Sequence, residues 1–146
     1  MTLEILKEKQ ELRDLIDNYA YLSDEWKIAE VMQLFAEDVT YKVYMGGNLV
    51  ADVSGRDNME RDFNMHAAQV KTYFTLNGQH TVNIDGDTAR GISFSQIKMV
   101  REVEGKDILS DYSVKCEDYY VKREGKWVIK DRVGHFLIIE SRPFNG

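Results

Sequence analysis

The segment from Gly78 to Gly91, GQHTVNIDGDTARG, constrains the fold more than any other part of the chain. It alternates between apolar and polar residues on both sides of Asp85-Gly86-Asp87, as two paired strands would. Asp-Gly is typical of a tight reversal because glycine tolerates positive φ. A mainly helical pattern precedes this hairpin, and further strand-like segments follow it. Helices followed by long antiparallel strands predict an α+β domain whose sheet can curl around a pocket.

Three helices and an early hairpin are predicted before residue 71. Apolar residues at helical spacing indicate an amphipathic helix from Leu3 to about Leu22. A second, shorter helix has an apolar face made of Ile28, Val31, Met32 and Phe35. The segment 38–54 alternates like a hairpin that reverses at residues 46–48. A third helix starts at residues 55–57, where Asp57 is a candidate N-cap, and its inward face comprises Met59, Phe63, His66 and Val70.

The rest of the chain predicts four long strands, over residues 71–84, 88–104, 108–122 and 127–140. Asn77-Gly78 interrupts the first of them and is a plausible β-bulge that would bend it. Short hairpin-like connections indicate that the strands pair in sequence order as an antiparallel meander. Strands longer than the usual ~5–6 residues favour a strongly curved sheet.

Composition narrows the class of protein. A chain of 146 residues with 43% hydrophobic and 30% charged residues fits one globular domain, spanning residues 1–146. A net charge of −6 argues against a nucleic-acid partner. No apolar run approaches the ~20 residues of a membrane span, and the N-terminus lacks the apolar core of a signal peptide. We therefore expect a cytoplasmic protein that has neither nucleic acid nor membrane as a partner.

Metal and disulfide chemistry are not expected from the sequence. The single cysteine, Cys116, excludes an internal disulfide and a multi-cysteine zinc site. The three histidines do not show the HxxxH or HxH spacing of common metal sites. We also expect no cofactor.

Four segments resemble the NTF2-like superfamily. They are Tyr19 with Asp24, VMQLFAEDV over residues 31–39, NGQHTVNIDGDTARG over 77–91, and DYYVKREGKWVIKDR over 118–132. The resemblance is strongest to the SnoaL-like branch, which includes scytalone dehydratase, bile-acid dehydratase and hexachlorocyclohexane dehydrochlorinase. It implies a cystatin-like cone, in which three N-terminal helices pack on the concave face of a curved, mostly antiparallel sheet around a mainly apolar cavity.

The resemblance also implies a catalytic site. Dehydratases of the superfamily commonly place a tyrosine and an aspartate from the first helix beside a histidine on the third strand. Tyr19 and Asp24 match the first two, but the histidine register falls on Thr75, and His80 lies five residues further on. Threonine cannot abstract a proton near neutral pH as imidazole can.

Each candidate catalytic residue has a structural alternative. Tyr19 either polarises a ligand oxygen or is a core tyrosine bonded to a backbone carbonyl. Asp24 either acts as a general base or caps the second helix. His80 shares parity with Val82 and Ile84, so it is an acid or base only if that sheet face borders the cavity.

Further residues are expected to line the cavity. His135 shares parity with Trp127 and Ile129, which would turn it inward, although a histidine on an apolar strand face is more often structural. Tyrosines in the strands suit a ring-bearing or polyketide-like ligand. The expected lining residues are Tyr41, Phe63, His66, Thr75, Tyr112 and His135.

Two functions follow. One is a cofactor-independent lyase or isomerase, in which Asp24 or His80 removes a proton from an apolar substrate while Tyr19 stabilises negative charge on oxygen. The alternative is a non-catalytic ligand-binding or dimeric assembly module of the same fold. A homodimer is expected in either case, because one sheet face lacks covering helices.

Overall fold

The computed structural model describes all residues from 1 to 146 and is an α+β structure, as the sequence predicts. Its elements in chain order are α1 (Leu3–Asp24), α2 (Ile28–Met32), β1 (Phe35–Met45), β2 (Asn48–Ser54), α3 (Arg56–Ala67), β3 (Val70–Asp85), β4 (Thr88–Val103), β5 (Lys106–Arg123) and β6 (Lys126–Pro143).

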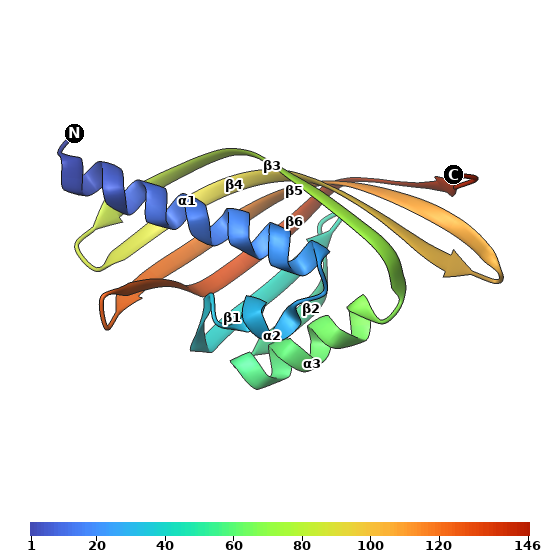
Figure 1. Ribbon diagram of the computed structural model, residues 1–146, viewed down its shortest axis with the longest axis horizontal. Coiled ribbons are helices and arrows are strands. Elements are labelled where there is room, and N and C mark those ends of the chain that lie inside the picture. Colours follow the sequence, from blue (N-terminus) through green and yellow to red (C-terminus); the bar gives the residue numbers. More distant parts are fainter.

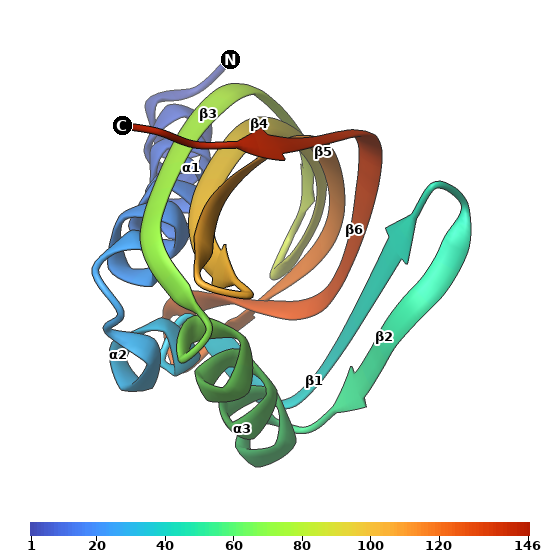
Figure 2. The same ribbon diagram turned by 90° about the vertical axis from the view of Figure 1, so that its right-hand side faces the viewer.

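All six strands form one sheet in the order β2-β1-β6-β5-β4-β3. Neighbouring strands are antiparallel except β1 and β6, which are parallel. The sheet does not close into a barrel. It curls around a central space, and the three helices lie along the side that the curl leaves open (Figures 1 and 2).

The core lies between the helices and one end of the sheet, where the last residues of β3 and β5 lie beside the first residues of β4 and β6. On α1, helical spacing places Leu12 and Leu15 in contact with the sheet, where Tyr120 and Ile129 are completely buried. The short helix α2 adds Val31 to the same cluster. The other end of the sheet, made by the first half of β3 and the second halves of β4 and β6 with the adjoining part of β5, extends beyond this core, and its concave face borders a cavity.

The sheet has several register shifts, and two of them decide on which face the candidate residues lie. In β3 the register shifts between Asn77 and His80, as the Asn-Gly pair predicts. In β6 Lys130 has no partner, because Tyr119 pairs with Asp131 while Tyr120 pairs with Ile129. A one-residue shift moves every following side chain to the other face of the sheet.

Three details differ from the sequence-based expectations. Phe35 starts β1 instead of ending the second helix, and Val70 starts β3 instead of ending the third. Asp57 is not a cap: Gly55 occupies the N-cap position, and α3 has no side-chain cap. A φ of 88° at Gly55 explains this, because glycine adopts that conformation readily.

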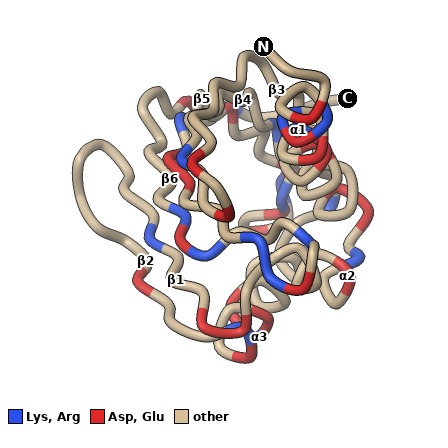
Figure 3. The backbone as a smooth tube through the Cα atoms, turned by 90° about the vertical axis from the view of Figure 1, so that its left-hand side faces the viewer, with Lys and Arg blue, Asp and Glu red and all other residues tan.

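Charge is distributed over the whole molecule. Lys and Arg alternate with Asp and Glu along the helices and strands, and no basic stripe is visible (Figure 3). No helix is both long and apolar enough to cross a membrane.

Candidate functional site

A cavity of about 640 Å³ lies between the concave face of the sheet and the helices. Its wall is mainly apolar, since 20 of its 33 lining residues are hydrophobic. The residues predicted from the sequence that do border it are Tyr19, Asp24, Tyr41, Phe63, His66, Thr75 and Tyr112. His66 lies at the rim, because its side chain is 70% exposed.

Tyr19 points from α1 into this cavity. Its ring packs edge-on against Phe35 and Phe63, at centroid distances of 5.8 and 6.3 Å. Burial raises the pKa of Tyr19, while the nearby Arg132 and Tyr41 partly oppose that rise. Burial also raises the pKa of Tyr41 well above its usual value. Both phenols are therefore neutral near neutral pH and can donate hydrogen bonds into the cavity.

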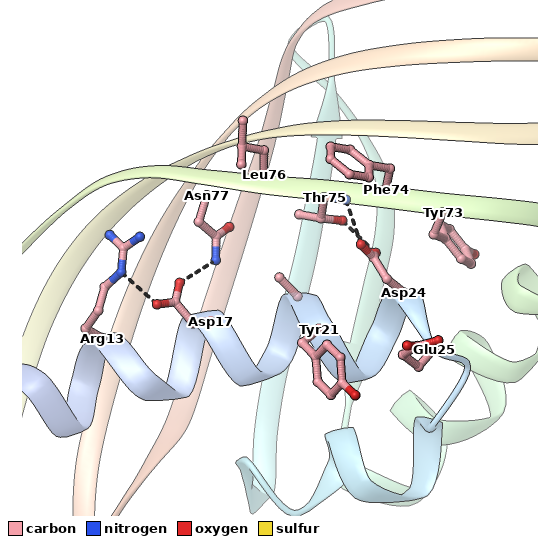
Figure 4. A pocket seen from close by; sticks show the side chains of 11 residues that line it. Arg13, Asp17, Tyr21, Asp24, Glu25, Tyr73, Phe74, Thr75, Leu76 and Asn77 are labelled. Carbon is pink, nitrogen blue, oxygen red and sulfur yellow. Dashed lines mark hydrogen bonds and ion pairs between the residues drawn. The ribbon is translucent and has the colours of Figure 1, made fainter.

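Asp24 binds Thr75. The backbone N–H of Thr75 donates to Oδ2 of Asp24 at 2.6 Å, and the Thr75 hydroxyl donates to Oδ1 at 2.8 Å (Figure 4). This excludes the capping alternative, since the N-cap of α2 is Lys27. The two residues border both the cavity and a surface groove between α1 and β3. Thr75, at the register expected for a histidine, thus holds the carboxylate that would otherwise act as a base.

A buried ion pair stands at the wall of the cavity. Arg132 donates from Nε and Nη2 to the two carboxylate oxygens of Asp118, at 2.8 and 2.9 Å. The two side chains are only 4% and 0% exposed. Arg132 borders the cavity, with its Cζ 4.3 Å from the centre of the Tyr19 ring.

Sequence reasoning missed Arg132 for a specific reason. The bulge at Lys130 reverses the alternation of β6, so that Arg132, Gly134 and Phe136 face the cavity. The same reversal turns His135 to the outer face, contrary to expectation. There the His135 ring stacks on Tyr44, with Nε2 3.3 Å from Glu117.

His80 lies on the helix-facing side of the sheet but does not border the cavity. Its Nε2 is 3.0 Å from the hydroxyl of Tyr120, and this hydroxyl donates to Oδ2 of Asp118 at 3.1 Å. Burial lowers the pKa of His80, Arg13 and Arg132 lower it further, and Asp118 and Asp17 oppose the shift. The structure therefore separates His80 from Tyr19 and Asp24.

Cys116 also borders the cavity. Burial raises the pKa of its thiol to about 11, so it is protonated at neutral pH and a weak nucleophile. No group of three His, Cys, Asp or Glu side chains is arranged to hold a metal ion.

Comparison with known proteins places these features in a family. The SnoaL-like domain model matches residues 4–133, and the chain therefore belongs to the SnoaL-like family. This confirms the resemblance inferred from the sequence. No curated protein matches the chain significantly.

Solved structures share the fold over almost the whole chain. A scytalone dehydratase candidate from Novosphingobium aromaticivorans superposes with a TM-score of 0.82 at 20% identity, covering 100% of this chain and 93% of its own. The hexachlorocyclohexane dehydrochlorinase LinA-type3 from Novosphingobium barchaimii superposes with a TM-score of 0.79 at 14% identity, covering 99% of this chain and 94% of its own. An NTF2-like protein with a cystatin-like fold from N. aromaticivorans superposes with a TM-score of 0.73 at 23% identity, covering 92% of this chain and 85% of its own. At these identities the likeness establishes the NTF2-like, cystatin-like fold.

Proposed function

We propose that the protein binds a mainly apolar, ring-bearing small molecule whose oxygen-bearing group contacts Tyr19, Tyr41 and Arg132. The observation that carries this proposal is a cavity of about 640 Å³ that is apolar over most of its wall and polar at one place. Small-molecule sites commonly have this size and this division between apolar walls and a few polar groups. The polar groups would set the orientation of the ligand, and the aromatic walls would contribute most of the affinity.

Binding can be tested without knowing the natural ligand. N-phenyl-1-naphthylamine is an uncharged aromatic probe whose fluorescence rises in apolar sites, and we expect one saturable site per chain. Ser95 borders the cavity, whereas its neighbour Gln96 is exposed on the other face of the sheet. Ser95→Trp should lower probe affinity at least about tenfold by filling the cavity, and Gln96→Trp should leave it unchanged. Equal effects of the two substitutions, or no saturable binding, would contradict the proposal.

A lyase or isomerase activity is the second candidate. It is favoured by one observation, that the Asp24 carboxylate and the Tyr19 ring border the same cavity. Asp24 would remove a proton from carbon, and the Tyr19 hydroxyl would donate to the oxygen on which negative charge develops. Both carboxylate oxygens of Asp24 already accept a hydrogen bond from Thr75, so a substrate proton would have to compete with these contacts. Ligand binding is therefore better supported than catalysis.

Hydrogen–deuterium exchange separates the two candidates. The probe 2-tetralone has a ring system, a carbonyl and acidic hydrogens beside it, and NMR in D₂O reports their loss. A proton-transferring enzyme should accelerate exchange, Asp24→Ala should abolish the acceleration, and Tyr19→Phe should reduce it by about 10²-fold. The same two substitutions should abolish turnover of the true substrate. Exchange at the same rate with wild type and Asp24→Ala would eliminate the proposed base.

A further inference from the structure

Behind the cavity wall, hydrogen bonds link four side chains in a row. His80 contacts Tyr120 at 3.0 Å, Tyr120 donates to Asp118 at 3.1 Å, and Asp118 accepts both hydrogen bonds of Arg132. We infer that His80 and Tyr120 are positioning residues, which hold the Asp118–Arg132 pair so that the guanidinium meets one charged class of ligand, an aromatic anion. This inference rests on the proposed ligand-binding function.

The direction of each hydrogen bond follows from the number of protons available. Tyr120 has a single O–H, and that proton goes to Asp118. The oxygen of Tyr120 must therefore accept from His80, which places a hydrogen on Nε2 of the imidazole. His80 thus acts as a donor, and an uncharged donor in the same place would serve equally well.

The space around this contact indicates a built arrangement. Tyr120 is completely buried, and the side chains of Asp118 and Arg132 are 0% and 4% exposed. Gly91 on β4 lies directly beside the contact: a Cβ there would come within 2.9 Å of Tyr120 Cε2 and 3.2 Å of His80 Nε2. The absence of a side chain at Gly91 therefore makes room for both rings.

The row of hydrogen bonds fixes the acceptor that orients Arg132. Asp118 receives three hydrogen bonds, two from Arg132 and one from Tyr120. Without the Tyr120 hydroxyl the carboxylate could rotate, and the guanidinium bound to it would move relative to the cavity. A displaced cation would weaken binding of an anionic ligand but would matter little to an uncharged one. Selectivity for charge is therefore the property that this row should control.

Two fluorescent probes of similar shape test the inference. One is 1-anilinonaphthalene-8-sulfonate, an anion, and the other is the uncharged N-phenyl-1-naphthylamine. We expect Tyr120→Phe and His80→Val each to lower affinity for the anion about tenfold, while affinity for the uncharged probe changes less than about twofold. His80→Gln should restore anion affinity, because its amide can donate to Tyr120. His135→Gln, at a half-buried histidine on the outer face, is the matched control and should change neither affinity.

The outcomes distinguish this inference from the function on which it rests. The double variant Asp118→Asn with Arg132→Gln removes both buried charges together, so neither is left unpaired. If it lowers anion affinity but Tyr120→Phe and His80→Val do not, the positioning role is wrong and the proposed ligand site stands. If the double variant leaves the ratio of the two affinities unchanged, Arg132 does not recognise the ligand. That result would contradict both the role of Arg132 in the proposed function and the positioning role of His80 and Tyr120. If Tyr120→Phe lowers affinity for both probes equally, or if His80→Gln does not restore anion affinity, the variants are damaged in general, and the positioning role is contradicted.

Discussion

At the scale of single residues, the unexpected feature is the pairing of Asp24 with Thr75. The sequence identifies both positions but gives no sign that they bind each other, because they are 51 residues apart. The carboxylate accepts from the backbone N–H and from the side chain of the same residue. The contact fastens the end of α1 to β3 and, at the same time, occupies both oxygens of the candidate base that borders the cavity.

Removing the Thr75 hydroxyl tests how much this contact contributes. Thr75→Val keeps the shape and the backbone N–H but deletes the donor to Oδ1 of Asp24. A hydrogen bond to a partly exposed charge should contribute about 1–2 kcal/mol to the free energy of unfolding, measured by urea denaturation. Thr81→Val, at an exposed β3 residue whose hydroxyl has no hydrogen bond within the protein, is the control. Equal losses in the two variants would show that the contact with Asp24 stabilises nothing.

His80 should make stability depend on pH. Its pKa is lower in the folded protein than the usual value of 6.5, chiefly because of burial. The unfolded chain therefore binds the proton more readily. The contribution of neutral His80 to the free energy of unfolding is fully present above about pH 6.5, and it is lost as the pH drops through the pKa of the folded state. Thermal denaturation between pH 8 and 5 should show a smaller loss in His80→Gln than in the wild type. Should His135→Gln flatten the profile instead, the assignment to His80 would be wrong.

At the scale of elements, the edge of β3 is protected by side chains of α1. Asp24 accepts from the backbone N–H of Thr75, and Arg13 donates to the backbone carbonyl of Gly78. In the other direction, the Asn77 side chain of β3 donates to the backbone carbonyl of Ile16. An exposed edge with free backbone groups invites pairing with another chain. Here the helix that covers the cavity also occupies that edge, which explains why such a long edge strand can end the sheet.

The close packing at Gly91 gives a prediction for β4. Gly91→Ala would place a methyl group 2.9 Å from a carbon of the completely buried Tyr120 ring and 3.0 Å from a carbon of Val82. Overpacking of this kind should lower the free energy of unfolding by about 1–3 kcal/mol. Gly78→Ala is the matched control, because its Cβ would come no closer than 3.5 Å to another atom. Chemical denaturation of both variants decides: similar stability would show that the strand shifts to make room.

The sequence predicts the helices and strands better than it predicts which face of the sheet each strand residue occupies. The helices, the hairpins and the β3 bulge follow from local patterns, since Asn77-Gly78 interrupts its strand visibly. The bulge at Lys130 has no such sign, because a lysine inside a regular alternation looks like any outward residue. Its position depends on how β6 pairs with β5 and β1. This one shift removed Arg132 from the predicted site and wrongly placed His135 in it.

At the scale of the whole molecule, the two faces of the curled sheet differ. The inner face borders the core and the cavity, while the outer face has no covering helix (Figure 2). Large apolar side chains on that outer face remain exposed, with Phe74, Leu76 and Ile138 each at least 60% accessible. Burial of such residues would contribute roughly 25 cal/mol per Å² of apolar surface, which favours association.

The homodimer expected from the sequence is therefore a prediction with a defined surface. Light scattering on the purified protein should give twice the mass of 17.0 kDa. Leu76→Lys together with Ile138→Lys should produce monomers, because two desolvated ammonium groups would cost far more than the contact gains. Binding of N-phenyl-1-naphthylamine should persist, since neither residue borders the cavity. Asn18→Lys, on the exposed side of α1, controls for added charge. A wild-type monomer, or a dimer unaffected by the double substitution, would exclude the outer face as the interface.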